Sequence, residues 1–133
     1  MNISLSEVLT LKQLGISEHC LAIENLHQED MAKCVGAFKQ VGIVEARKMA
    51  DVVGGQIVDF KVNDSTEWAI MMEPIKDLMI IFAMQKYSPE FEDTVATFYG
   101  KQTNDLEISI EDLYDFTRLC TNALVLASKK PCT

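Results

Sequence analysis

Apolar residues in the first half of the chain recur with the period of a helix. A capping-box pattern, Ser4 to Glu7, predicts a helix from Leu5 to Leu14 that Gly15 brings to an end. The same spacing of apolar positions, three or four residues apart, predicts further helices over residues 17–26, 28–41 and 43–53. The first 55 residues are therefore expected to be helical.

This helical half contains an internal repeat. Residues 11–18 read LKQLGISE and residues 38–45 read FKQVGIVE, so that Lys, Gln, Gly, Ile and Glu are identical in register. Each copy lies where one predicted helix ends and the next begins. The repeat predicts two helical hairpins with the same turn, within residues 1–55.

The middle of the chain changes from the helical period to alternation. Apolar and polar residues alternate over 56–62, and the apolar run 68–72 follows a turn-forming segment, which predicts a short β-hairpin within residues 56–72. Residues 75–87 are apolar on nearly all sides and predict a buried helix. Residues 78–84 fit a core strand equally well, so both assignments stay open at this stage.

Helix-start signals reappear near the C-terminus. Ser88, Pro89 and Glu90 combine a cap, a proline at the first position and an acid in the first turn, which predicts a helix reaching residue 99. Ser109 predicts the cap of a last helix. The predicted fold class is mostly α, a single-domain helical bundle over residues 1–133, with helical hairpins over 1–55, the β-hairpin in 56–73 and C-terminal helices over 74–130.

Charge and hydropathy limit the classes of function that this chain is expected to have. The chain has 12 Lys and Arg against 20 Asp and Glu, a formal net charge of −8. That balance disfavours direct nucleic-acid binding, which needs clustered cations. The longest apolar run, 78–84, is too short to cross a membrane, and the N-terminus lacks the pattern of a signal peptide. We therefore expect a cytoplasmic protein that binds neither nucleic acid nor membrane.

Catalytic and metal chemistry finds little support. Cys20, His27 and Cys34 are spaced seven residues apart, or about 10.5 Å on a continuous helix, which is too far for three ligands of one zinc ion. His19 neighbours Cys20 in sequence, but adjacent helical residues point about 100° apart and do not form a dyad. A small enzyme is thus the least favoured class, and no metal or cofactor is expected.

The remaining candidate chemistry is acidic. Carboxylates gather in the segments around two predicted helix starts and in the loop between them, and Trp68 is a candidate interface anchor if it is partly exposed. The predicted partner-binding residues are Glu90, Glu92, Asp93, Asp105, Glu107, Glu111, Asp112, Asp115 and Trp68.

These residues favour a small acidic inhibitor that covers a basic protein surface. An immunity protein against a cationic, nuclease-type toxin and a nucleic-acid mimic are both of this kind. The alternative is a cytosolic adaptor or chaperone that grips a partner peptide or helix in an apolar groove.

Overall fold

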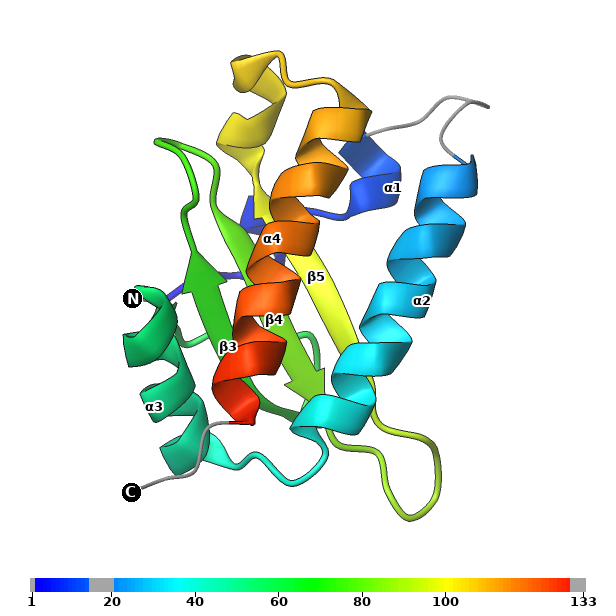
Figure 1. Ribbon diagram of the computed structural model, residues 1–133, viewed down its shortest axis with the longest axis vertical. Coiled ribbons are helices and arrows are strands. Elements are labelled where there is room, and N and C mark those ends of the chain that lie inside the picture. Colours follow the sequence, from blue (N-terminus) through cyan, green and yellow to red (C-terminus); the bar gives the residue numbers. More distant parts are fainter. Residues whose placement is uncertain (1, 15–20, 130–133) are drawn as a thin grey trace.

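The computed structural model describes residues 2–14 and 21–129, and it contains a five-stranded antiparallel sheet (Figure 1). The strand order is β1-β5-β4-β3-β2. The strands are β1 (Val8–Leu9), β2 (Gln56–Ile57), β3 (Thr66–Met72), β4 (Ile80–Gln85) and β5 (Thr94–Gly100). The helices are η1 (Leu5–Glu7), α1 (Leu11–Leu14), α2 (Leu21–Phe38), α3 (Ile43–Val53), η3 (Lys101–Leu106) and α4 (Ile110–Ser128).

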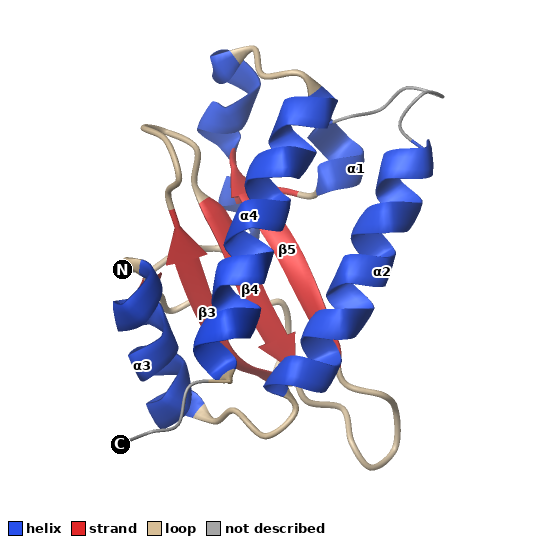
Figure 2. Ribbon diagram, viewed as in Figure 1, coloured by secondary structure: helices blue, strands red, loops and turns tan. Residues whose placement is uncertain are grey.

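This architecture is an α+β fold, so the predicted mostly α bundle is wrong. Helices α2, α3 and α4 lie on one face of the sheet, and α4 crosses its centre (Figure 2). The helices therefore pack against strands as well as against one another. The sheet is the element that the helical interpretation missed.

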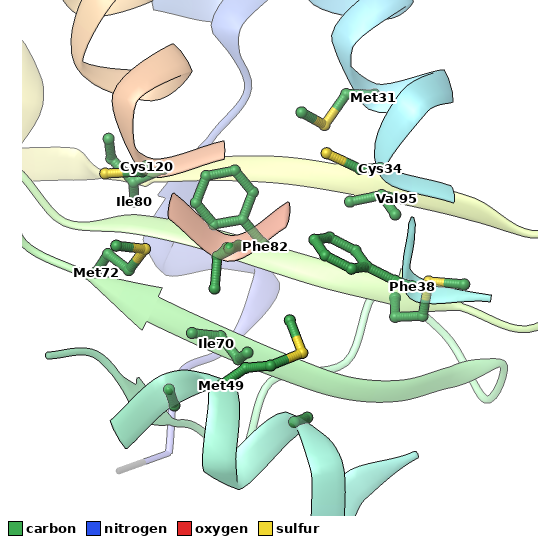
Figure 3. Packing of buried hydrophobic residues seen from close by; sticks show 14 of the residues in the cluster. Met31, Cys34, Phe38, Met49, Ile70, Met72, Ile80, Phe82, Val95 and Cys120 are labelled. Atoms are coloured by element: carbon green, nitrogen blue, oxygen red, sulfur yellow. The ribbon is translucent and has the colours of Figure 1, made fainter. Parts of the chain in front are cut away.

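The main hydrophobic core lies between the helices and this face of the sheet. Figure 3 shows Met31, Cys34 and Phe38 of α2 approaching Val95 and Phe82 of the sheet. Alternate residues of each strand point to opposite faces, so every second residue of β3, β4 and β5 joins this core. The strand contributors are Trp68, Ile70, Met72, Ile80, Phe82, Met84, Val95 and Tyr99.

A second core covers the other face of the sheet without any long helix. The segment after β2 folds across this face, and the Phe60 and Phe98 rings meet edge to face with centroids 5.1 Å apart. The N-terminal segment joins it, since the N–H of Ile3 donates to the carbonyl of Asp59 at 3.0 Å. Both faces of β4 are consequently buried.

Burial on both faces explains why residues 75–87 do not form the predicted helix. A strand covered on two sides is apolar at every position and loses the alternation that would identify it. All six residues of β4 are buried, and the open alternative of a core strand over 78–84 is the better description. The β-hairpin predicted within residues 56–72 is partly right. Strand β2 pairs with β3, but β2 covers only Gln56–Ile57.

The predicted helix from Ser88 to residue 99 is also wrong. Residues 86–93 form a loop with a cis peptide bond between Ser88 and Pro89, and β5 follows. The run Val-Ala-Thr-Phe-Tyr in β5 is rich in β-branched and aromatic residues, which pack well on a pleated sheet. Pairing with β4 along six positions fixes it as a strand.

The N-terminal predictions fail in part. The Ser4–Glu7 pairing exists, with the Ser4 N–H donating to Glu7 Oε1 at 3.1 Å, but it opens only η1 and is followed by β1. Helix α2 is continuous from Leu21 to Phe38, where two helices were predicted. Residues 15–20 lie outside the described part of the chain. They include the first repeat turn at Gly15, the start of the helix predicted over 17–26, and His19 and Cys20.

The predicted positions of α3 and α4 are confirmed. Gly54 ends α3 in the left-handed conformation, with φ 74°, and the Asp112 N–H donates to the Ser109 hydroxyl at 3.1 Å to open α4. At the second repeat turn, the Gly42 N–H donates to Glu45 Oε1 at 3.2 Å. In the described ranges, no helix has the length and apolar character needed to cross a membrane.

Candidate partner-binding groove

The predicted acidic residues fall into two groups at opposite ends of β5. Strand β5 has seven residues, so its ends are about 20 Å apart at 3.3 Å per residue. The loop 86–93 precedes the strand, and η3 with the start of α4 follows it, at the other end of the molecule (Figure 1). Glu90, Glu92 and Asp93 form the first group, and Asp105, Glu107, Glu111, Asp112 and Asp115 form the second. The structure does not bring the two groups into one continuous face.

The second group is explained largely by local helix chemistry. Glu111 and Asp112 occupy the first turn of α4, where carboxylates offset the positive end of the helix. Asp105 lies in η3 and Glu107 just after it, and both are exposed. Asp115 is exposed one turn further along α4.

Asp93 is a structural residue of the loop rather than a free surface charge. Its Oδ1 accepts hydrogen bonds from the N–H of Tyr87 at 2.8 Å, the N–H of Ser88 at 3.0 Å and the hydroxyl of Ser88 at 2.9 Å. These donors, the Ser88 N–H first among them, hold the pKa of Asp93 below its usual value. Asp93 thus closes the loop on itself, and only Glu90 and Glu92 of the first group are exposed.

Trp68 is part of the main core and is not an exposed anchor. Its side chain is 3% exposed, and its indole Nε1 donates to the carbonyl of Val41 at 2.9 Å. The Phe38 ring packs against it edge to face. Trp68 therefore does not meet the condition of partial exposure on which its prediction as an interface anchor depended.

The first acidic group lies beside a groove between α2 and the loop 86–93. A hollow of about 260 Å³ separates α2 from the start of β5, and a second of about 710 Å³ continues it beneath the loop. Val35, Glu92 and Asp93 line both hollows, so the two adjoin. We call this surface the α2 groove; its lining residues are Gln28, Met31, Ala32, Val35, Lys39 and residues 88–95.

The two walls of the α2 groove differ in chemistry. The helix side is apolar at Met31, Ala32 and Val35, with Gln28 on the helix and Lys39 just past its end as the polar residues of that side. The opposite wall carries the Glu90 and Glu92 carboxylates. A surface of this kind offers apolar contact along the helix and an attraction for cations along the lip.

Phe91 adds an apolar contact to the same lip. Its side chain is 73% exposed, the largest exposure of any large apolar residue in the described part of the chain. Sequence reasoning missed it as a site residue because Phe91 lay within the helix predicted from Ser88 to residue 99. A large exposed apolar side chain beside a groove is typical of a binding surface.

The loop wall is tied to the rest of the fold at its base. The Lys86 ammonium donates to the carbonyl of Lys39 at the end of α2 and forms an ion pair with Glu67 at 3.6 Å. The Asn63 amide donates to the Tyr87 hydroxyl at 3.0 Å. The Lys86 contact joins the base of the loop to the end of α2, and the Glu67 and Asn63 contacts join it to β3 and the turn before β3.

The two cysteines in the described part of the chain, Cys34 and Cys120, are buried. Burial raises the pKa of the Cys34 thiol to about 12 and that of Cys120 to about 11, so both are protonated near neutral pH. Among residues 2–14 and 21–129, no three His, Cys, Asp or Glu side chains converge as metal ligands.

Comparisons with protein families, curated proteins and solved structures find no match to this chain, so its own geometry must identify the site.

Proposed function

We propose that this protein is a binding module that holds a cationic segment of a partner protein in the α2 groove. The observation that carries the proposal is the pairing of an apolar helix wall with a lip that presents Phe91, Glu90 and Glu92. Apolar contact supplies affinity, and the lip selects partners that carry Lys or Arg. We place this binding in the cytosol.

A grooved adaptor or chaperone fits this geometry better than an inhibitor that covers a broad basic surface. Such an inhibitor needs one extended acidic face, whereas the two acidic groups lie at opposite ends of β5. The net charge of −8 still favours a cationic partner, such as a nuclease-type toxin, and an immunity protein that captured one basic segment would use the same groove.

Selection from a peptide library displayed on phage tests the proposal. We expect the immobilised protein to enrich peptides that combine Lys or Arg with apolar residues, and binding of those peptides to weaken as salt rises. Enrichment of acidic peptides, or of none, would contradict the proposal.

Two matched pairs of variants locate the binding. The double variant Glu90→Lys/Glu92→Lys should weaken peptide binding about tenfold or more, equivalent to about 1.4 kcal/mol. Its control, Glu111→Lys/Asp112→Lys, makes the same charge change at the other end of β5 and should leave affinity within about twofold.

The second pair tests the apolar contact. Phe91→Ala should weaken binding, whereas Leu119→Ala on α4, where the side chain is 65% exposed, should not. Equal effects within either pair would show that the peptides bind outside the α2 groove.

A further inference from the structure

Strand β5 has an open edge along most of its length. On the side away from β4, only its last two residues are paired, Tyr99 with Leu9 and Gly100 with Val8 of β1. Residues 94–98 have no strand partner on that side among the described residues. An unpaired edge of this kind is a template for another strand.

Hydrogen-bond geometry identifies the backbone groups that point out of this edge. The Gly100 N–H donates to the carbonyl of Met79 at 3.0 Å, so Gly100 directs its backbone groups toward the β4 side. In an antiparallel pair, successive residues alternate between bonding the partner and facing away from it. Phe98 and Ala96 therefore bond β4, whereas Thr97 and Val95 direct their N–H and C=O groups outward.

The α2 groove adjoins the Thr94 end of this edge. Thr94 and Val95 of β5 form one side of the smaller hollow, opposite Met31, Ala32 and Val35 of α2. Natural edges are commonly blunted by a charged residue or a proline, and residues 94–98 contain neither. The Thr94–Val95 end of the open edge and the apolar helix wall thus face the same space.

We propose that a cationic segment of the partner binds in extended form and adds a strand to the open edge of β5. This inference rests on the proposed function and deepens it, since it states how the partner segment is held. The outward N–H and C=O groups of Val95 and Thr97 supply main-chain hydrogen bonds, and the α2 groove supplies side-chain specificity.

The fold sets the side-chain pattern of the bound segment. Residues directly opposite each other on paired strands point to the same face. Val95 and Thr97 point toward the helices, since Val95 joins the main core and the Thr97 hydroxyl contacts the Met31 sulfur at 3.0 Å. Partner residues opposite them would contact α2 and should be apolar.

Charge fixes the end of the segment that carries Lys or Arg. Glu92 lies two residues before β5 begins and lines both hollows, so cationic residues should lie beyond the Thr94 end of the strand. A second copy of this chain is a poorer occupant. It would bring two chains of net charge −8 together and would add acidic rather than basic residues to the lip.

Amide exchange measured residue by residue with NMR tests the open edge in the free protein. We expect the amides of Val95 and Thr97 to exchange at least about tenfold faster than those of Ala96 and Phe98, because only the latter pair bonds β4. Equal protection of all four amides would overturn the proposal before any ligand is added.

Designed peptides test the added strand. The probes are short synthetic peptides of alternating valine and threonine with two lysines at one end, made with the lysines at either terminus. The peptide that places its lysines beyond Thr94 should slow exchange at Val95 and Thr97 about tenfold or more and leave Ala96 and Phe98 unchanged. Replacing the lysines with glutamates should abolish the effect.

An N-methylated version of the binding peptide separates the two proposals. Methyl groups on the amides that face β5 remove those donors and should weaken binding about tenfold or more. Equal binding by both versions, without protection of Val95 and Thr97, would overturn strand addition and leave groove binding intact. Failure of every lysine peptide to bind would overturn both the groove binding and the strand addition. Protection of the Val95 and Thr97 amides that rises with protein concentration, without any peptide, would assign the edge to a second copy.

Discussion

The indole Nε1 of Trp68 donates a hydrogen bond to the carbonyl of Val41 at 2.9 Å, which joins β3 to the turn between α2 and α3. The Phe38 ring, at the end of α2, lies edge to face with the indole at 5.6 Å. One side chain thereby fixes the sheet relative to the end of α2. The carbonyl of Lys39, in the same turn, anchors the groove loop through Lys86.

Trp68→Phe is expected to destabilise the fold by about 2 kcal/mol or more. The substitution leaves the buried Val41 carbonyl without a donor, a loss of roughly 1–3 kcal/mol, and it also removes ring volume from the core. Urea denaturation followed by circular dichroism measures the change in the free energy of unfolding. An effect below about 0.5 kcal/mol, the range of surface substitutions, would contradict the role assigned to Trp68.

Asp93 provides a test of the loop that forms one wall of the α2 groove. Asp93→Ala removes the acceptor of the Tyr87 and Ser88 donors, so the loop 86–93 should become more susceptible to limited proteolysis. Asp93→Asn keeps one oxygen acceptor and should have the smaller effect. If the two variants were cleaved at the rate of the unmodified protein, the loop would be held by other contacts.

Because the pKa of Asp93 is lowered, the loop 86–93 should lose stability in acid. A carboxyl group whose pKa is lower in the folded state contributes stability above its unfolded value of about 3.9, and loses it as pH falls through the folded value. Loop cleavage by an acid-active protease should therefore increase below about pH 4 in the unmodified protein. Asp93→Asn should be cleaved at a rate that changes less over the same range.

Local signals predicted α3 and α4 correctly, because their ends are decided by residues close in sequence. Gly54 ends α3 in a left-handed conformation, and Ser109 caps α4. Strand β5 could not be found in this way. Ser88, Pro89 and Glu90 carry the local chemistry of a helix start, and the pairing with β4 that overrides them depends on residues brought together by the whole sheet.

The α2 groove was beyond sequence reasoning for the same reason. Its two walls come from α2 and from the segment around β5, and the contact between Thr97 and Met31 joins positions 66 residues apart. Met31, Cys34 and Phe38 of α2 lie in the main core, whereas Val35 of the same helix is only half-buried and lines the groove.

His27 is expected to make the fold less stable in mild acid. Burial lowers the pKa of His27, and this effect exceeds that of the negative charges of Asp30 and Glu24, which raise it. The Nδ1 of His27 has no hydrogen-bond partner in the described part of the chain. The unfolded chain then takes up a proton at about pH 6.5 while the folded protein does not, so stability falls as pH drops from there toward the folded value.

The difference between the protein and its His27→Met variant isolates this effect. Both should be measured by urea denaturation between about pH 7.5 and pH 5, a range that brackets the ordinary histidine pKa. Methionine fills the buried site without a titrating group, so the variant should lose less stability over this range. Parallel pH profiles would show that His27 titrates as freely in the folded protein as in the unfolded chain.

The hydroxyl of Tyr114 on α4 donates to Asp30 on α2 at 2.7 Å, and Arg118 lies 3.9 Å from the same carboxylate. Tyr114→Phe should cost about 1.5–3 kcal/mol, the usual range for a hydrogen bond to a charged group. Arg118→Ala should cost less, about 0.2–1 kcal/mol, because that ion pair is more exposed. Thermal unfolding of the two variants tests which contact joins the helices more strongly. A larger loss of stability in Arg118→Ala than in Tyr114→Phe would contradict the expected order.

Gln85 offers a substitution that should raise stability. Its side chain is 2% exposed, yet its Oε1 has no hydrogen-bond partner among the described residues. A buried acceptor without a donor costs roughly 1–3 kcal/mol, and methionine has a similar unbranched shape without that cost. Gln85→Met should therefore increase the free energy of unfolding by about 1 kcal/mol. Gln85→Glu, which buries a charge at the same position, should lower it, and a loss of stability in both variants would show that the Gln85 amide makes a favourable polar contact.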